Sequence, residues 1–475
     1  MEASNPAVNH LIISKEAATP LESPLKFFDR ERTVAGPGFN RWLVPPAALA
    51  VHLSIGQVYA FSVFKLPLTK IIGVTNSAPG DWTQPQLAWI FSLAICFLGL
   101  SAAVFGRWVE RVGPRKTMAT AALCFGGGLI LSALGVWGHQ LWIIYLGYGV
   151  LGGCGLGLGY ISPVSTLVKW FPDRPGMATG MAIMGFGGGA FIGSNLSLLL
   201  MDHFKSATTT GVGQAFIALG LIYFCYMMFG SLIVRVPAKD WKPAGYQAPD
   251  HPHGLITTAN VALDQAWRTP QFWLLWIVLC FNVTAGIGIL EQASPMIQEM
   301  FAGKVTVAAA GGFVALLSLF NMGGRFVWSS LSDYTGRKAI YVVYLLLGAV
   351  LYALIPLSGH TRSDVLFVVV CAVILSMYGG GFATIPAYLK DLFGTMQVGA
   401  IHGRLLTAWS VAGILGPVLV NYIREYLKAQ GASGVGLYAP TMYLMSGLLV
   451  IALICNLSVR PVDKRFHFHE QNSQA

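Results

Sequence analysis

The sequence predicts an all-α membrane protein with about twelve transmembrane helices in two pseudo-symmetric six-helix bundles. Of the 475 residues, 55% are hydrophobic and only 11% are charged, whereas about a quarter of the residues in a soluble globular protein are charged. Twelve apolar runs are long enough to cross a bilayer. In addition, a set of residues in the first half recurs 223 positions later in the second half.

The predicted helices follow from runs of roughly 20 mostly apolar residues, the length that crosses the hydrocarbon core. The first half has runs at 42–64, 86–106, 117–137, 141–168, 176–200 and 213–234. The second half has runs at 272–294, 307–331, 339–358, 365–388, 400–423 and 439–459. The expected domains are an N-terminal tail (1–38), a first bundle (39–234), a polar proline-containing linker (235–271), a second bundle (272–460) and a C-terminal tail (461–475).

The positive charges predict which side of the membrane each loop occupies. With twelve helices, 22 Lys and Arg residues fall on the side of the termini and 7 on the opposite side. Cytoplasmic loops carry the excess of Lys and Arg, so we expect both termini in the cytoplasm and a location in the plasma (bacterial inner) membrane. The net charge of +10 then needs no nucleic-acid partner, because the basic residues lie in separate short loops. Residues 1–38 show no signal peptide.

Composition also argues against several chemistries. The seven cysteines lie in apolar runs without a C-x-x-C pair, so we expect neither a disulfide framework nor a metal site. The glycine-rich runs at 152–159 and 185–193 lie inside apolar helices, where they favour close helix packing over a nucleotide loop. His251, His253, His467 and His469 lie in polar segments, where metal binding is not expected. We expect no cofactor and no enzyme activity.

The offset of 223 residues relates five pairs of residues: Glu110 and Asp333, Gly113 and Gly336, Pro163 and Pro386, Gly180 and Gly403, and Gly193 and Gly416. One coincidence would mean little in a chain with 55 glycines. A shared offset over four helices of each half indicates an internal duplication, which is common among transporters.

Two loops at this offset carry a charged motif. The loop after the second predicted helix contains Gly106, Glu110, Arg111, Gly113 and Arg115, and the loop after the eighth contains Asp333, Gly336 and Arg337. An acidic residue just past a helix end, followed by Gly and basic residues, can form charge pairs that hold helices in one conformational state. A basic loop that only sets topology is the alternative. The loops resemble the loop signature of the major facilitator superfamily, with Glu110 where Asp is commoner.

Further motifs resemble those of the oxalate:formate antiporter family within that superfamily. They are Arg268-Thr269-Pro270-Gln271-Phe272-Trp273, Lys169-Trp170-Phe171-Pro172-Asp173, Asn321-Met322-Gly323-Gly324-Arg325, Tyr378-Gly379-Gly380-Gly381-Phe382 and Asp391-Leu392-Phe393-Gly394. The resemblance covers nearly the whole chain apart from the tails and the linker. It implies a secondary transporter that alternates between inward-open and outward-open states around a small organic anion, working as a monomer in the lipid bilayer.

Arg325 is the main candidate for binding that anion. It lies eight residues before Asp333, which places it about 12 Å from the end of its helix. A guanidinium at this depth should face a watery cavity and meet an anion, and its geometry matches a carboxylate. The resemblance implies the same role. The alternative is a structural arginine that bonds helix carbonyls or Glu291.

Trp409 departs from the family pattern. The oxalate carrier has a lysine at the matching position, and Arg404 lies too near the cytoplasmic end to replace it. With one positive clamp, a monocarboxylate such as pyruvate, lactate or formate fits better than the dianion oxalate. An oxalate/formate-type exchanger remains an alternative, as does an anion sensor without net flux.

Aromatic residues complete the predicted substrate site. By resemblance, Tyr59 and Tyr160 fall at positions of cavity tyrosines, and Phe186, Tyr378 and Phe382 align with other cavity aromatics; core packing is the alternative for each. Two titratable residues, His52 and Glu291, lie in predicted helices and are candidates for coupling transport to protons. A neutral His52 bonded to a backbone carbonyl is the alternative reading.

Overall fold

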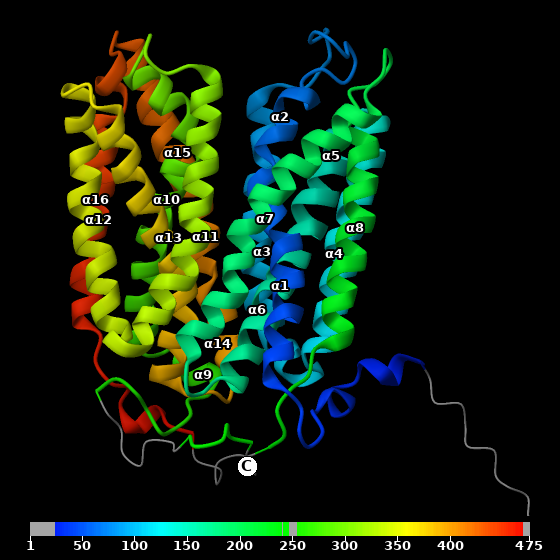
Figure 1. The fold of residues 1–475 in the computed structure, drawn as a ribbon, viewed down its shortest axis with the longest axis vertical. Coiled ribbons are helices and arrows are strands. Elements are labelled where there is room, and N and C mark those ends of the chain that lie inside the picture. Colours follow the sequence, from blue (N-terminus) through cyan, green and yellow to red (C-terminus); the bar gives the residue numbers. More distant parts are fainter. Residues whose placement is uncertain (1–23, 240, 247–253, 469–475) are drawn as a thin grey trace, which may run out of the picture.

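The computed structural model describes residues 24–239, 241–246 and 254–468. In these residues the chain is helical apart from loops and three isolated β-bridges. Twelve helices of the described chain are long and apolar enough to cross a membrane, which confirms the predicted number of spans. Figure 1 shows two bundles side by side, which meet at the end where the linker lies and diverge at the opposite end.

The first bundle begins with η3 (Arg41–Leu43), α1 (Val44–Ile55), η4 (Gly56–Ala60), α2 (Ser62–Leu68) and α3 (Gln84–Val112). It continues with α4 (Pro114–Trp137), α5 (Leu141–Ile144), the π-helical η5 (Tyr145–Gly152), α6 (Gly153–Trp170), α7 (Pro175–Phe204) and α8 (Val212–Ile233).

The second bundle comprises α10 (Pro270–Met300), α11 (Val307–Thr335), α12 (Arg337–His360), α13 (Asp364–Phe393), α14 (Val398–Leu405), α15 (Thr407–Ala429), η6 (Gly434–Leu437) and α16 (Ala439–Ser458). Short helices outside the bundles are η1 (Pro24–Phe28), η2 (Arg30–Thr33), α9 (Leu263–Ala266) and η7 (Lys464–Phe466).

Three of the predicted helices are interrupted rather than continuous. The first divides into α1, η4 and α2, the fourth into α5, η5 and α6, and the eleventh into α14 and α15. The first break lies where another helix comes very close: a Cβ on Gly56 would lie 2.3 Å from the carbonyl oxygen of Phe186 in α7. The π-helical segment lies at a similar approach, because a Cβ on Gly128 of α4 would lie 2.5 Å from the Gly147 carbonyl.

The two bundles contact each other through equivalent helices. Helix α7 packs against α11 and α13, while α3 packs against α14 and α15. Gly180 and Gly403, one of the repeated pairs, sit at these contacts. A Cβ on Gly180 would lie 2.1 Å from Ser329 Oγ, and a Cβ on Gly403 would lie 2.2 Å from the Ala102 carbonyl oxygen. The internal repeat of the sequence is therefore a repeat in helix packing, which small residues make possible.

The described part of the N-terminal tail and the linker cover the end at which the bundles meet (Figure 1). Ala35 N donates to the Val236 carbonyl at 2.9 Å, and Val236 N donates to the Thr33 carbonyl at 2.9 Å. Further along the linker, Val261 N donates to the Phe393 carbonyl at 2.9 Å. The linker therefore contacts both the tail and the second bundle.

Candidate functional site

Arg325 lies in α11 where the two bundles meet, and its side chain is 0% exposed. Its Nε donates to Asn321 Oδ1 at 3.2 Å, and its Nη1 donates to the carbonyl oxygen of Ile183 in α7 at 3.3 Å. Its Nη2 is buried and has no hydrogen-bond partner among the described residues. The bond to Ile183 agrees with the alternative of a structural arginine that bonds helix carbonyls. Nη2, however, is left as a donor that could bond a substrate.

Six aromatic side chains surround this guanidinium, and we call them the aromatic cluster: Tyr59, Tyr160, Phe186, Tyr378, Phe382 and Trp409. The Arg325 Cζ lies 5.5 Å from the ring centroids of both Phe186 and Phe382. Trp409 stands 4.4 Å from Phe382, 5.3 Å from Tyr160 and 5.4 Å from Phe186, measured between centroids. The structure therefore brings together all seven residues that the sequence predicted for the substrate site.

The aromatic cluster is built by both bundles. Tyr59, Tyr160 and Phe186 come from η4, α6 and α7, whereas Tyr378, Phe382 and Trp409 come from α13 and α15. Across this boundary, the hydroxyl groups of Tyr59 and Tyr378 lie 3.0 Å apart. The site is consequently assembled only when the bundles are in contact.

Several polar atoms around the cluster are buried without a partner among the described residues. They are Tyr160 Oη, Trp409 Nε1, His52 Nε2, His402 Nε2 and Arg325 Nη2. Buried polar groups are normally hydrogen-bonded, and leaving one unmade costs about 1–3 kcal/mol. Three of these atoms, Arg325 Nη2, Tyr160 Oη and Trp409 Nε1, are hydrogen-bond donors, and together with the charge of Arg325 they form a site that can accept a small anion.

Of the two residues predicted to couple transport to protons, the structure describes the side chain of His52 but not that of Glu291. His52 in α1 is buried, and its Nδ1 lies 3.0 Å from the Ala48 carbonyl oxygen, as in the alternative of a backbone-bonded histidine. Its Nε2 nevertheless has no hydrogen-bond partner in the part of the chain that the structure describes. The side chain of Glu291 lies outside the described residues, as do His251, His253 and His469.

Sequence reasoning missed His402, which lies in α14 and is 1% exposed. Its ring centroid lies 5.7 Å from that of Tyr160, and the His52 centroid lies 5.4 Å from the same ring. The available signal was a titratable residue inside an apolar run, the criterion that singled out His52. His402 lies two residues before Arg404, which the sequence places near the cytoplasmic end, so the same end was expected for His402.

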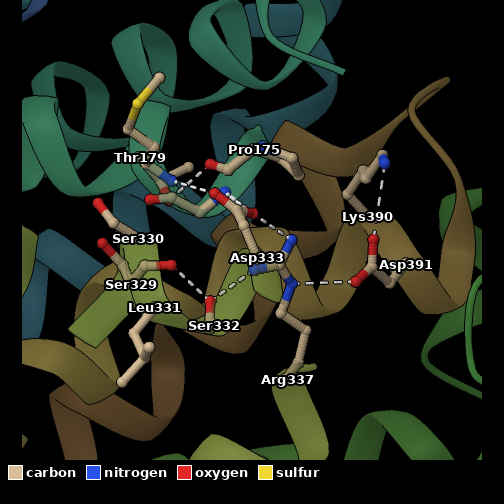
Figure 2. Close-up of polar contacts among 12 residues, drawn as sticks. Pro175, Thr179, Ser329, Ser330, Leu331, Ser332, Asp333, Arg337, Lys390 and Asp391 are labelled. Atoms are coloured by element: carbon tan, nitrogen blue, oxygen red, sulfur yellow. Dashed lines mark hydrogen bonds and ion pairs between the residues drawn. The ribbon is translucent and has the colours of Figure 1, made fainter. Parts of the chain in front are cut away.

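The charged loop motifs connect the two bundles at the linker end. Asp333 accepts hydrogen bonds from Gly176 N at 2.9 Å and from Met177 N at 2.8 Å, at the start of α7 (Figure 2). The same carboxylate pairs with Arg337 at 2.6 Å, and Arg337 also bonds Asp391 at 3.0 Å. A carboxylate at a helix N-terminus is favourable because it meets free N–H groups and the positive end of the helix dipole.

Glu110 makes the equivalent contact in the opposite direction. Its Oε1 accepts from Gly399 N at 3.1 Å, at the start of α14, and its Oε2 pairs with Lys169 at 2.6 Å. Gly399 follows Gly176 by the same 223 residues that separate Asp333 from Glu110. Each bundle therefore supplies one carboxylate that caps a helix of the other bundle.

Two expectations for the charged loop motifs were wrong: the position of the acidic residues and the partner of Arg115. Glu110 and Asp333 lie within the last turn of α3 and α11, not past the helix end, because the helices continue to Val112 and Thr335. Arg115 joins no charge pair among the described residues: it is buried, donates to the Phe27 carbonyl at 2.8 Å and stacks on the Phe27 ring.

The remaining motif residues have structural or exposed positions. Arg111 is exposed at the end of α3. Gly113 and Gly336 have φ of 84° and 85° between successive helices, a conformation that favours glycine. Gly106 lies where a Cβ would come within 2.8 Å of the Ala400 Cα in the other bundle.

Comparison with known proteins decides the family. The family model described as Major Facilitator Superfamily matches residues 39–417, more than half of the chain. The chain belongs to the major facilitator superfamily. Members of this superfamily are transporters, so the predictions of a multi-pass integral membrane transporter and of a chain that is not an enzyme are confirmed.

Individual members of the superfamily resemble the chain over most of its length. The oxalate:formate antiporter of Oxalobacter formigenes is 27% identical over 384 residues, covering 79% of this chain and 83% of the relative. The apicoplast pyruvate carrier 1 of Toxoplasma gondii is 21% identical over 453 residues, covering 84% and 79%. Among solved structures, the transporter FucP in the outward conformation matches with a TM-score of 0.63 at 13% identity, covering 88% of this chain and 99% of FucP.

Proposed function

We propose that this major facilitator protein carries a small carboxylate across the membrane by alternating access. The proposal rests on the Nη2 of the fully buried Arg325, which lies inside the aromatic cluster and has no hydrogen-bond partner among the described residues. A buried charge is costly unless it is paired, and a carboxylate would bond Nη2 while neutralising the guanidinium. Trp409 Nε1 and Tyr160 Oη are free to bond further substrate oxygens.

A monocarboxylate suits this site better than a dianion. Within the group formed by the aromatic cluster, His52, His402 and Arg325, the arginine supplies the one fixed positive charge. Trp409, where the oxalate carrier has lysine, is 0% exposed and adds apolar surface. A relative named for pyruvate supports the same class of substrate, while a relative named for oxalate and formate keeps exchange of carboxylates as the alternative.

The described conformation supports access from the end opposite the linker. Tyr59 is partly exposed, whereas the other five members of the aromatic cluster are buried. Meanwhile the contacts of Glu110 and Asp333 close the linker end. With the linker end in the cytoplasm, as the loop charges favour, this is an outward-facing state of a plasma-membrane carrier.

The remaining features of the proposal concern organisation and coupling. We place the tails at 1–38 and 461–475, the bundles at 39–234 and 272–460, and the linker at 235–271. The carrier functions as a monomer, since the two bundles of one chain complete the site. His52 binds a proton during transport; Glu291 stays a candidate for the same role.

The proposal is tested by uptake into proteoliposomes. Labelled pyruvate, lactate, formate and oxalate are offered with and without an inward proton gradient, and with or without preloaded carboxylate. We expect uptake of a monocarboxylate that a proton gradient stimulates and that Arg325→Gln abolishes. Uptake only against preloaded carboxylate would replace proton coupling by exchange, and no flux of any of the four would contradict the proposed substrate class.

A further inference from the structure

His52 and His402 face the same tyrosine from opposite bundles. Their ring centroids lie 5.4 Å and 5.7 Å from that of Tyr160. Both side chains are at most 1% exposed, and the Nε2 of each has no partner among the described residues. Two imidazole nitrogens without a partner in the described part of the chain, one from each bundle, therefore lie around a ring that also borders the Arg325 site.

We infer that His52 and His402 form a shared proton site that fills together with the carboxylate on Arg325. The inference rests on the proposed function and adds to it a second residue and a reason why proton and substrate bind together. The proton comes from the solution on the side from which the carboxylate enters. It binds to the lone pair of a free Nε2, and the imidazole becomes an imidazolium.

The coupling follows from the charges in the site. In the empty site, a proton on either imidazole would add a second positive charge to the buried surroundings that already hold Arg325, because Tyr160 and Phe186 connect the histidines to this guanidinium by ring contacts; like charges in a buried site repel strongly. The two imidazoles contact the same Tyr160 ring, so two protons on the pair would repel each other as well, and we expect the pair to take up one proton. A bound carboxylate neutralises Arg325, removes this repulsion and attracts the imidazolium. By linkage, the proton then favours the carboxylate to the same extent.

The other charged groups near the pair are already bonded or distant. Besides Arg325 from α11, the titratable groups of the described surroundings are tyrosines: Tyr59, Tyr160 and Tyr378 of the aromatic cluster, Tyr223 from α8 and Tyr341 from α12. Around α14, the charged side chains at the linker end bond to one another: Arg107 and Arg404 to Asp264, Lys169 to Glu110, and Lys390 and Arg337 to Asp391. Around α1, Arg41 pairs with Asp173 and Arg115 bonds the Phe27 carbonyl at that end, while Asp202 and His203 lie exposed at the far end of α7.

The positions of the two histidines also provide a way to release the proton. His402 belongs to α14, which packs against α3 and α6 of the other bundle. Opening of the linker end separates these helices, so His402 moves away from Tyr160 and meets water. The carboxylate and the proton then leave on the same side.

Isothermal titration calorimetry of the full-length protein tests this inference directly. Pyruvate, lactate, formate and oxalate are titrated at pH 7 in two buffers with different ionisation enthalpies, which reports the protons taken up per carboxylate bound. We expect the wild type to take up close to one proton, and its affinity to rise about tenfold per unit fall in pH near neutrality. His402→Gln and His52→Gln should each reduce this uptake, and the double variant should abolish it while still binding carboxylate.

The controls separate this inference from the proposed function. His203→Gln, which changes an exposed histidine, should leave proton uptake unchanged. If a carboxylate binds to the wild type without proton uptake, the inference is overturned and the proposed function stays intact. Undiminished proton uptake in the double variant would have the same consequence. Failure of all four carboxylates to bind the wild type would contradict the proposed function itself.

Discussion

At the scale of single residues, the site is defined by a buried guanidinium that has no acidic partner among the described side chains. Arg325 bonds one amide oxygen and one backbone carbonyl, and no carboxylate of the described side chains joins them. In a membrane protein, a charge at this depth is expensive and usually functional. We therefore expect a transported carboxylate to act as the temporary partner of Arg325, which would link substrate binding to the stability of the site.

Substitutions of Arg325 should separate its charge from its geometry. Arg325→Lys keeps a positive charge but loses the planar fork, so we expect carboxylate binding to weaken roughly ten- to a hundredfold, as for a lost charge-assisted hydrogen bond of about 1.5–3 kcal/mol. Arg325→Gln should abolish binding. Titration calorimetry measures both, with Arg235→Lys at the linker end as control; equal binding by wild type and Arg325→Gln would rule out the assigned role.

Replacing Trp409 should change which carboxylate is preferred. Trp409→Lys places a second positive charge next to Arg325, so we expect oxalate to bind better and monocarboxylates worse. Trp409→Phe keeps the site apolar and should preserve the monocarboxylate preference. Competition between labelled pyruvate and unlabelled oxalate measures the change, and an unaltered preference in Trp409→Lys would show that charge count does not select the substrate.

At the scale of helices, closure of the linker end depends on two reciprocal caps. Asp333 of the second bundle caps α7, and Glu110 of the first bundle caps α14. Both carboxylates are held in turn by a basic residue of their own bundle, Arg337 and Lys169. The two caps exist only while the bundles touch, so they stabilise one conformational state rather than the fold of either bundle.

Removal of one cap should shift the equilibrium toward opening at the linker end. Asp333→Asn loses the negative charge that caps the α7 N-terminus across the boundary between the bundles, which we expect to cost about 1–3 kcal/mol of the closed state. The readout is maleimide labelling of Ser329→Cys in a background without native cysteines, because Ser329 is buried against Gly176 and Gly180. Labelling should accelerate roughly ten- to a hundredfold. The control is Asp364→Asn, which removes a carboxylate paired with Lys304 away from this contact and should leave the labelling rate unchanged. An unchanged labelling rate in Asp333→Asn would contradict the role of the caps.

Close helix packing between the bundles gives a steric counterpart of this prediction. In Gly403→Ala, the new Cβ would lie 2.2 Å from the Ala102 carbonyl oxygen, a separation that requires the backbones to move apart. We expect a folded protein with little transport activity. Gly447→Ala introduces the same atom where nothing lies within 4 Å and should transport normally. Equal uptake rates for the two variants would argue that α14 and α3 need not approach this closely.

At the scale of the whole molecule, the duplicated architecture was predictable from sequence because it depends on local composition and on a constant offset. Apolar runs located the twelve spans, and the offset of 223 residues paired Glu110 with Asp333 before their partners were known. The depth of Arg325 followed from helix rise alone. The roles of the site residues stay predictions, which the substitutions of Arg325 and Trp409 test.

Features that depend on contacts between distant segments could not be predicted in this way. The pairing of Arg115 with Phe27 joins the N-terminal tail to α4, and no local pattern encodes it. The breaks that create η4 and separate α14 from α15 arise inside continuous apolar runs. His402 enters the site only because α14 packs against α6 across the boundary between the bundles.

A structure of the wild-type chain with saturating pyruvate tests the central claim most directly. The account predicts a carboxylate within hydrogen-bond distance of Arg325 Nη2, enclosed by Tyr160, Phe186 and Trp409. A carboxylate bound elsewhere, with Arg325 still bonded to Asn321 and Ile183 and the aromatic cluster unoccupied, would contradict it.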